Sequence, residues 1–128
     1  MNVNKFKSFD GKLGSLIPFE LTDFQYYIKR VFFVKDVPIN TIRGNHAHYK
    51  TKQILCCISG QIEVILFDGI NEEKQILNKN EYVYVDNLIW DSQKFITDDA
   101  ILFVMSNTNY DPNDYIFDID EFIKIKNK

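Results

Sequence analysis

Short apolar stretches, separated by turn residues, run along most of the chain. Stretches rich in Val, Ile, Phe and Tyr are typical of β-strands, and Gly, Pro, Asn and Asp interrupt them. The pattern predicts strands over residues 24–35, 41–49, 53–59, 61–67, 74–77, 81–85, 89–95 and 100–106. The tail predicts a helix start at Asp111 and Pro112 and one short helix over residues 118–125. Many short strands without a long amphipathic helix indicate an all-β sandwich or barrel.

The N-terminal part of the chain is expected to contain an edge strand that another strand must cover. Residues 6–20 are mixed, with a turn signal at Asp10 and Gly11, and the aromatic strand expected over residues 24–35 follows them. All-β folds leave edge strands whose backbone groups invite another strand. We therefore expect a second copy of the chain to cover this region, giving a homodimer.

Length and charge narrow the class of protein. With 128 residues, the chain is expected to form a single domain over residues 1–128. A net charge of −3 does not indicate a nucleic-acid partner, and neither a signal-peptide pattern nor a membrane-length apolar run is seen. The two cysteines, Cys56 and Cys57, are adjacent and fit a reducing compartment. We expect a cytoplasmic protein.

The candidate chemistry lies in the stretch R-G-N-H-A-H, which holds the chain's two histidines, His46 and His48. One residue separates them, so on a strand both imidazoles point to the same face. Such a pair can bind a metal ion, transfer protons as general base and acid, or serve as satisfied core residues. The adjacent Gly44 is expected to permit a close backbone approach beside them.

The spacing after the histidines resembles the first metal-binding motif of the cupin superfamily. Four residues separate His48 from Gln53, which stands where cupins usually have Glu, and six more precede Gly60. In a degraded second motif, Trp90 takes the place of the fourth ligand, a His. A neutral amide is a poor ligand for a transition metal and an indole is none. We therefore expect no metal and no cofactor, with the histidines moving protons instead.

Two arginines are candidates for binding an anion. Arg43 precedes His46 by three residues and can grip a phosphate in bidentate fashion, although a surface ion pair explains it equally well. Arg30 lies in an otherwise apolar strand and needs an anionic partner, either a protein carboxylate or a ligand. The carboxylates of the tail are expected to form a solvated face, namely Asp111, Asp114, Asp118, Asp120 and Glu121.

Taken with its surroundings, the histidine stretch resembles a specific family. R-G-N-H-A-H followed by Gln53 is similar to the R-G-x-H-A-H signature of the dTDP-sugar 3,4-ketoisomerases, also called the WxcM-like family. The likeness extends to K-R-V-F-F-V, L-C-C-I-S-G-Q-I-E-V, Y-V-Y-V-D-N-L-I-W-D and D-Y-I-F-D-I-D-E-F. It covers most of the chain from about Gly14 onward.

The resemblance implies a fold, an assembly and a reaction. The family forms a small cupin-type jelly-roll β-barrel and dimerises by exchanging N-terminal strands. It works without metal, moving the carbonyl of dTDP-4-keto-6-deoxyglucose from C4 to C3 for 3-amino-3,6-dideoxyhexose synthesis. In these terms His46 is the main proton shuttle and His48 its partner. The substrate-binding candidates are Arg30, Arg43, Gln53 and Trp90, the last as a wall of the pocket.

Departures from the family leave the substrate and the product open. Phe32 and Phe33 stand where relatives often have Tyr, so a catalytic hydroxyl would have to come from elsewhere. Phe117 stands where Arg is common. The sequence does not fix which histidine is the primary base or the C4 configuration of the product. A dTDP-sugar 3,5-epimerase, a non-catalytic sugar-binding cupin and a metal-dependent cupin remain as alternatives.

Overall fold

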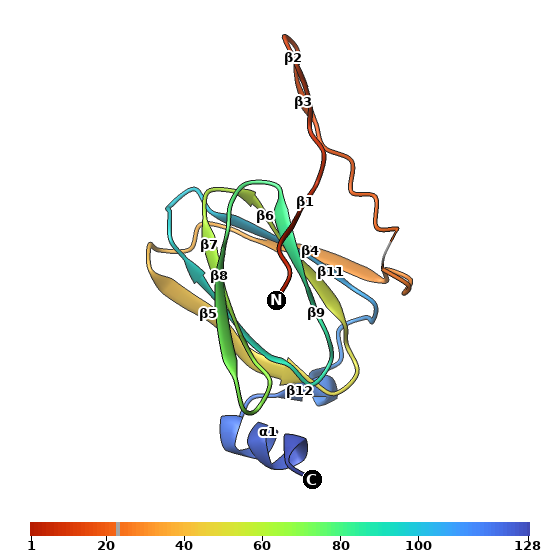
Figure 1. Cartoon of the computed structure of the whole chain (residues 1–128), viewed down its shortest axis with the longest axis vertical. Coiled ribbons are helices and arrows are strands. Elements are labelled where there is room, and N and C mark those ends of the chain that lie inside the picture. The colour runs from red at the N-terminus through yellow and green to blue at the C-terminus, as the bar shows by residue number, and fades with distance from the viewer. Residues whose placement is uncertain (23) are drawn as a thin grey trace.

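The structure, a computed structural model, describes residues 1–22 and 24–128 and consists mainly of two five-stranded antiparallel sheets (Figure 1). The first sheet has the order β1 (Asn4–Lys5), β9 (Glu81–Val85), β6 (Gln53–Ser59), β11 (Ile101–Ser106) and β4 (Arg30–Val34). The second has the order β12 (Tyr115–Ile116), β5 (Thr41–His48), β10 (Trp90–Phe95), β7 (Ile62–Phe67) and β8 (Glu72–Leu77). The all-β prediction is therefore confirmed.

The main core lies between the two sheets and follows from strand alternation. Every second residue of a strand faces the opposite sheet, and at the centre of the sandwich these positions are apolar and buried. Leu55 of β6 and Val104 of β11 meet Val64 of β7 and Phe95 of β10 in one buried cluster. Burying such side chains contributes about 1.5–3 kcal/mol each. The same inward alternation determines which polar residues enter the space between the sheets.

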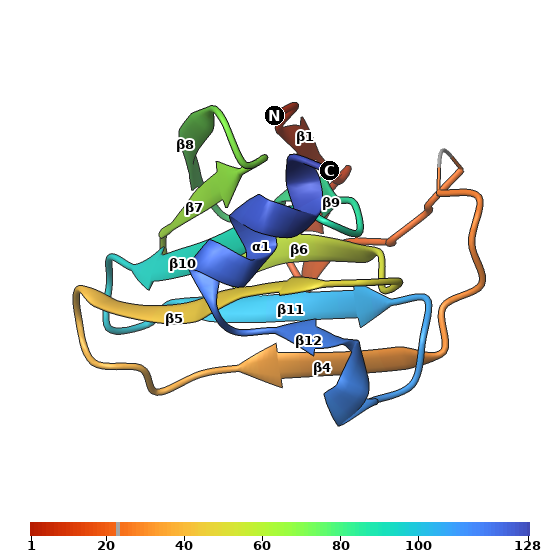
Figure 2. The ribbon, with the colours of Figure 1, turned by 90° about the horizontal axis from the view of Figure 1, so that it is seen from below.

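The C-terminal helix covers the outer face of the second sheet. Helix α1 (Ile119–Lys126) begins after Asp118, whose carboxylate caps it by accepting the backbone N–H of Asp120 at 2.9 Å. Figure 2 shows α1 in front of β10. Phe122 of this helix is fully buried and packs against Trp90 of β10. The predicted helix is confirmed to within one residue at each end. Within the described residues, no helix is long and apolar enough to cross a membrane.

The N-terminal segment forms a hairpin that projects from the body of the molecule (Figure 1). Strands β2 (Phe9–Gly11) and β3 (Gly14–Leu16) pair with each other, and no described strand pairs with them on either side. The turn lies at Lys12 and Leu13 rather than at the predicted position two residues earlier. Two-stranded hairpins are marginal on their own in water.

The strand predicted over residues 24–35 is wrong in length, because only Arg30–Val34 is strand. The strand stops there because its partner β11 ends at Ser106. The backbone N–H of Lys29 donates to the carbonyl of Ser106, and this is the last hydrogen bond between the two segments. The preceding residues, including Phe24 and Ile28, instead pack in irregular conformation on the outer face of the first sheet. Phe24 and Ile28 are partly buried there, whereas Tyr26 and Tyr27 are exposed, so aromatic composition did not report strand pairing.

Candidate active site

A cavity of about 460 Å³, part of it open to solvent, opens between the two sheets. Its wall is apolar on the side of the first sheet, apart from Gln53 of β6, and polar on the side of the second. The apolar side chains are Phe32, Val34, Leu55, Leu102 and Val104. The polar ones are Arg43, His46, Gln53, Asp91, Gln93 and Tyr115. Few polar groups converging in an otherwise apolar hollow are typical of a small-molecule site.

A β-bulge in β5 brings Arg43 and His46 to the same cavity. Simple alternation would place residues three apart on opposite faces. However, the register between β5 and β10 shifts at this point. Adjacent residues of β10, Asp91 and Ser92, pair with His46 and Gly44 of β5, which are two residues apart. The extra residue, Asn45, has φ +57°. The bulge therefore adds one residue and resets the alternation.

Gly44 is required by this geometry. Its φ is +88°, in the left-handed region that favours glycine. A Cβ on Gly44 would lie 2.9 Å from Oε1 of Gln93 and 3.0 Å from the backbone carbonyl of Asp91. The expected close approach beside the histidines is therefore present, and it is an approach to β10.

The two imidazoles share the inner face of β5, but His46 alone of the pair lines the cavity. Their ring centroids lie 5.0 Å apart at an interplanar angle of 79°. His48 is buried behind Tyr115, whose ring centroid lies 4.4 Å away. Tyr115 belongs to the short strand β12, which pairs with β5 directly opposite His48. His46 is thus the histidine at the cavity, and His48 lies behind it.

His48 is held in its neutral form by its surroundings. Burial and, to a lesser extent, the His46 imidazole lower its pKa to about 4, although the Asp114 carboxylate opposes the shift. Nδ1 of His48 faces Oδ2 of Asp114 at 3.4 Å, without a well-formed hydrogen bond. Its Nε2 has no hydrogen-bond partner among the described residues. His48 is therefore an uncharged imidazole beside a fixed carboxylate.

Asp114 corrects one expectation, because it is not part of a solvated acidic face. It is buried and accepts hydrogen bonds from the backbone N–H groups of Lys50 at 2.9 Å and Thr51 at 3.1 Å. The hydroxyl of Thr51 donates a further one at 2.5 Å. The Asp–Pro helix-start signal seen in the sequence forms the 3-10 helix η1 (Pro112–Asp114), which presents this carboxylate. The other four tail carboxylates are exposed, as expected.

Asp91 is the main site residue that sequence reasoning missed. It stands directly opposite His46 across β5 and β10, is 2% exposed and lines the cavity. Its neighbour Trp90 was instead expected to form a wall of the pocket. Alternation turns Trp90 to the outer face, where it packs on Phe122, so its position does not support a role in the pocket. Counting back from Phe95 in steps of two would have found Asp91.

The remaining predicted residues divide between the cavity and its surroundings. Gln53 is buried, lines the cavity and donates from Nε2 to Ser106 Oγ at 3.1 Å. Arg43 is exposed at the cavity and forms no ion pair with any described residue. Arg30 does not line it. Its guanidinium lies over the rings of Phe32 and Tyr110, at 4.5 and 5.3 Å from their centroids.

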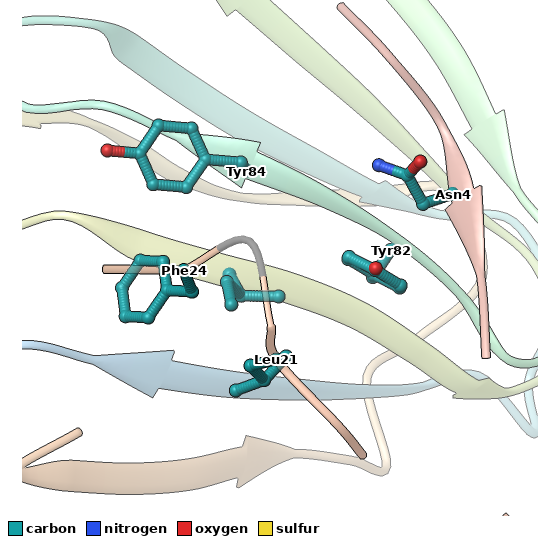
Figure 3. Close-up of a pocket in the computed structure, with 6 residues that line it drawn as sticks. Asn4, Leu21, Phe24, Tyr82 and Tyr84 are labelled. Atoms are coloured by element: carbon teal, nitrogen blue, oxygen red, sulfur yellow. The ribbon is translucent and has the colours of Figure 1, made fainter. Parts of the chain in front are cut away.

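A second hollow, of about 390 Å³, lies on the outer face of the first sheet (Figure 3). Tyr82 and Tyr84 of β9 and Asn4 of β1 line it together with Leu21 and Phe24 from the N-terminal segment. Among the described residues that line it, the two phenols are the only ionisable groups. In the part of the chain that the structure describes, no three His, Cys, Asp or Glu side chains are grouped as metal ligands. The cavity with His46 is therefore the candidate active site.

Comparison with known proteins agrees with this fold and site. A family model described as FdtA, WxcM-like, C-terminal, matches residues 1–127. A TDP-4-oxo-6-deoxy-alpha-D-glucose-3,4-oxoisomerase of Aneurinibacillus thermoaerophilus is 34% identical over 124 residues, which are 95% of this chain and 89% of that protein.

Solved structures show the same likeness in three dimensions. A 3,4-ketoisomerase from Helicobacter canadensis superposes with a TM-score of 0.92 at 32% identity, covering 99% of this chain and 97% of that one. QdtA, a sugar 3,4-ketoisomerase from Thermoanaerobacterium thermosaccharolyticum in complex with TDP, gives 0.91 at 31% identity, over 98% and 93% of the two chains. The expected cupin-type fold is confirmed. The chain belongs to the WxcM-like FdtA family of sugar 3,4-ketoisomerases.

Proposed function

We propose that this protein moves the keto group of dTDP-4-keto-6-deoxyglucose, or a close relative of that sugar nucleotide, from C4 to C3. The relatives are named for this reaction, and one of them was solved with TDP bound. The observation that carries the proposal for this chain is the position of His46. It is the imidazole that lines the cavity, and a carboxyl group stands directly opposite it.

The reaction is a proton relocation that an imidazole can perform. The C4 ketone acidifies the proton on C3, so a base can remove it and leave an enediol. Delivery of that proton to C4 then completes the isomerisation. His46 is the base that takes the proton from C3 and returns it at C4. Neutral imidazole suits this task because its ordinary pKa lies near neutral pH.

His48 and Asp114 act on His46 from behind. The edge-on contact of the two imidazoles and the buried carboxylate beside His48 restrict the positions of both rings. Because His48 stays uncharged, it does not place a positive charge next to the base. His48 is thus a positioning residue in this proposal, and the main shuttle is His46.

The polar rim of the cavity provides groups for the rest of the substrate. Arg43 is exposed and unpaired among the described residues at the cavity, so it can bind the diphosphate. The amide of Gln53 reaches the cavity and can bind a sugar oxygen. Arg30 lies further out, over Tyr110, and its partner is a more distant part of the nucleotide. No role in substrate binding is assigned to Trp90.

The test is incubation with dTDP-4-keto-6-deoxyglucose in deuterated water, followed by NMR of the product. A 3,4-ketoisomerase gives a C3 ketone with deuterium at C4, whereas a 3,5-epimerase keeps the C4 ketone and places deuterium at C5. We expect His46→Asn to lower isomerisation by at least 10²-fold, as expected for loss of a general base, while TDP still binds in calorimetry. Asp98→Asn, a substitution of an exposed loop residue, is the matched control. Retained isomerisation in His46→Asn would refute this role.

A homodimer with exchanged N-terminal segments is part of the proposal. The projecting hairpin exposes Phe9 (61%) and Leu16 (62%), and on the edge strand β4 Phe33 is 60% exposed. Apolar side chains gathered in this way are typical of an interface. The hairpin of one copy would cover the outer face of the first sheet of the other. Light scattering after gel filtration tests this, and a monomer that remains at micromolar concentration would contradict it.

The proposed location is the cytoplasm. Cys56 and Cys57 are free and buried, and burial raises the pKa of their thiols to about 12 and about 11. Such thiols are unreactive and fit a reducing compartment. Fractionation with an antibody against the chain tests the location.

A further inference from the structure

Asp91 is a buried carboxyl group with one oxygen left free. Its Oδ1 accepts a hydrogen bond from Nε2 of Gln93, whereas its Oδ2 accepts none from any described residue. The side chain lines the cavity and is 2% exposed. A buried polar atom without a partner costs free energy of about 1–3 kcal/mol. A structure that tolerates such an atom beside a binding cavity suggests that a ligand supplies the partner.

The surroundings of Asp91 favour its protonated form. Burial raises the pKa of its carboxyl group, and the His46 imidazole and the Gln93 amide oppose this rise only in part. Asp91 therefore keeps its proton to higher pH than an ordinary aspartate. A carboxylic acid in this position can donate a proton through the free oxygen.

The reaction of the proposed function needs such a group in addition to His46. Two hydroxyl protons must move, one onto the oxygen at C4 and one away from the oxygen at C3. His48 does not line the cavity. Among the polar side chains that do, guanidinium and amide groups do not act as general acids or bases at neutral pH. This leaves Asp91 and the phenol of Tyr115, and Asp91 is the one directly opposite His46.

We propose that Asp91 carries the hydroxyl protons of the isomerisation, working on the two substrate oxygens while His46 works on the two carbons. This inference rests on the proposed function and adds a second catalytic residue to it. Directly opposed residues on antiparallel strands have Cβ atoms about 4.5–5.5 Å apart. Imidazole and carboxyl group can therefore reach neighbouring atoms of one sugar.

The steps balance without any further reactant. His46 removes the proton from C3, and the electrons of that C–H bond form the C3–C4 double bond. The π electrons of the C4 carbonyl move onto its oxygen, which takes the proton from Asp91. The products are the neutral enediol, the imidazolium of His46 and the carboxylate of Asp91. The carboxylate then takes the proton from the C3 hydroxyl, so that a carbonyl forms at C3, while the double bond takes the proton from His46 at C4. Both side chains return to their starting protonation states.

The experiment compares Asp91→Asn with the wild-type protein, using dTDP-4-keto-6-deoxyglucose as substrate and TDP as binding probe. The amide keeps the size of the side chain but has no acidic proton. We expect isomerisation to fall by about 10²–10⁴-fold, the range for loss of a general acid. The dissociation constant for TDP is expected to change less than threefold. Asp98→Asn serves as the exposed control.

A second reading does not depend on the variant being folded. Carboxyl ¹³C NMR of wild-type protein labelled at aspartate, assigned through the backbone, should show the Asp91 carboxyl group titrating at higher pH than the exposed aspartates. Titration of Asp91 together with the exposed aspartates overturns the inference, as does Asp91→Asn turnover within threefold of wild type. If Tyr115→Phe abolishes turnover and Asp91→Asn does not, the acid is Tyr115. Failure of the wild-type protein to isomerise the substrate instead overturns the proposed function itself.

Discussion

Acidification should destabilise this protein through His48. In the folded protein the pKa of His48 is about 4, against an ordinary value of 6.5. As the pH falls below 6.5, the unfolded chain binds a proton at this position and the folded chain does not, so stability decreases with falling pH. Each pKa unit corresponds to 1.36 kcal/mol. The loss is about 2 kcal/mol between pH 7 and pH 5 and approaches about 3 kcal/mol near pH 4.

The assay is urea unfolding, followed by the fluorescence of Trp90, of the wild-type protein and His48→Asn at pH 7, 6 and 5. All other titrating groups are common to both proteins, so the difference between their two pH dependences isolates His48. The variant is expected to lose about 2 kcal/mol less than wild type between pH 7 and pH 5. Parallel curves for the two proteins would refute the reasoning, because they would mean that His48 titrates alike in the folded and unfolded states.

Two further substitutions test the framework of the site. Gly44→Ala should cost about 2–4 kcal/mol, because a left-handed φ disfavours alanine and its Cβ would lie 2.9 Å from a side-chain oxygen on β10. Thermal unfolding measures this, and a change below 0.5 kcal/mol would mean that the bulge relaxes freely. Asp114→Asn should cost about 1–3 kcal/mol, because one oxygen becomes an amide that cannot accept the buried N–H of Thr51. Unfolding in urea checks this, and an unchanged midpoint would show that the N–H finds another acceptor.

Much of the fold was predictable because composition and turn residues mark each strand. Most strands of the two sheets fall within a residue or two of their predicted bounds. The failures came where tertiary contacts decide the local structure. The region around Phe24 packs on the first sheet without pairing, and β12 is too short to carry a pattern.

The candidate site was predicted in part. The motif identified His46, Arg43 and Gln53, which all line the cavity. Trp90 was named and Asp91 was not, because a motif alignment fixes neighbours along the chain and says nothing about which face of a strand each one occupies. Asp114 was missed because an acidic residue in an acidic stretch of sequence is normally expected to be exposed to solvent. Its burial depends on backbone N–H donors more than sixty residues away in the chain.

The short strand β12 has a consequence for how the enzyme becomes active during synthesis. The strands of both large sheets, apart from this one, are complete once residue 106 has been made. Until Asp114 and Tyr115 leave the ribosome, His48 lacks both its carboxylate and its aromatic cover. A nascent chain can therefore build its barrel before it has a finished catalytic centre. Premature release after residue 106 but before Asp114 would leave the strands of both large sheets, apart from β12, with a histidine pair that lacks its carboxylate and its aromatic cover.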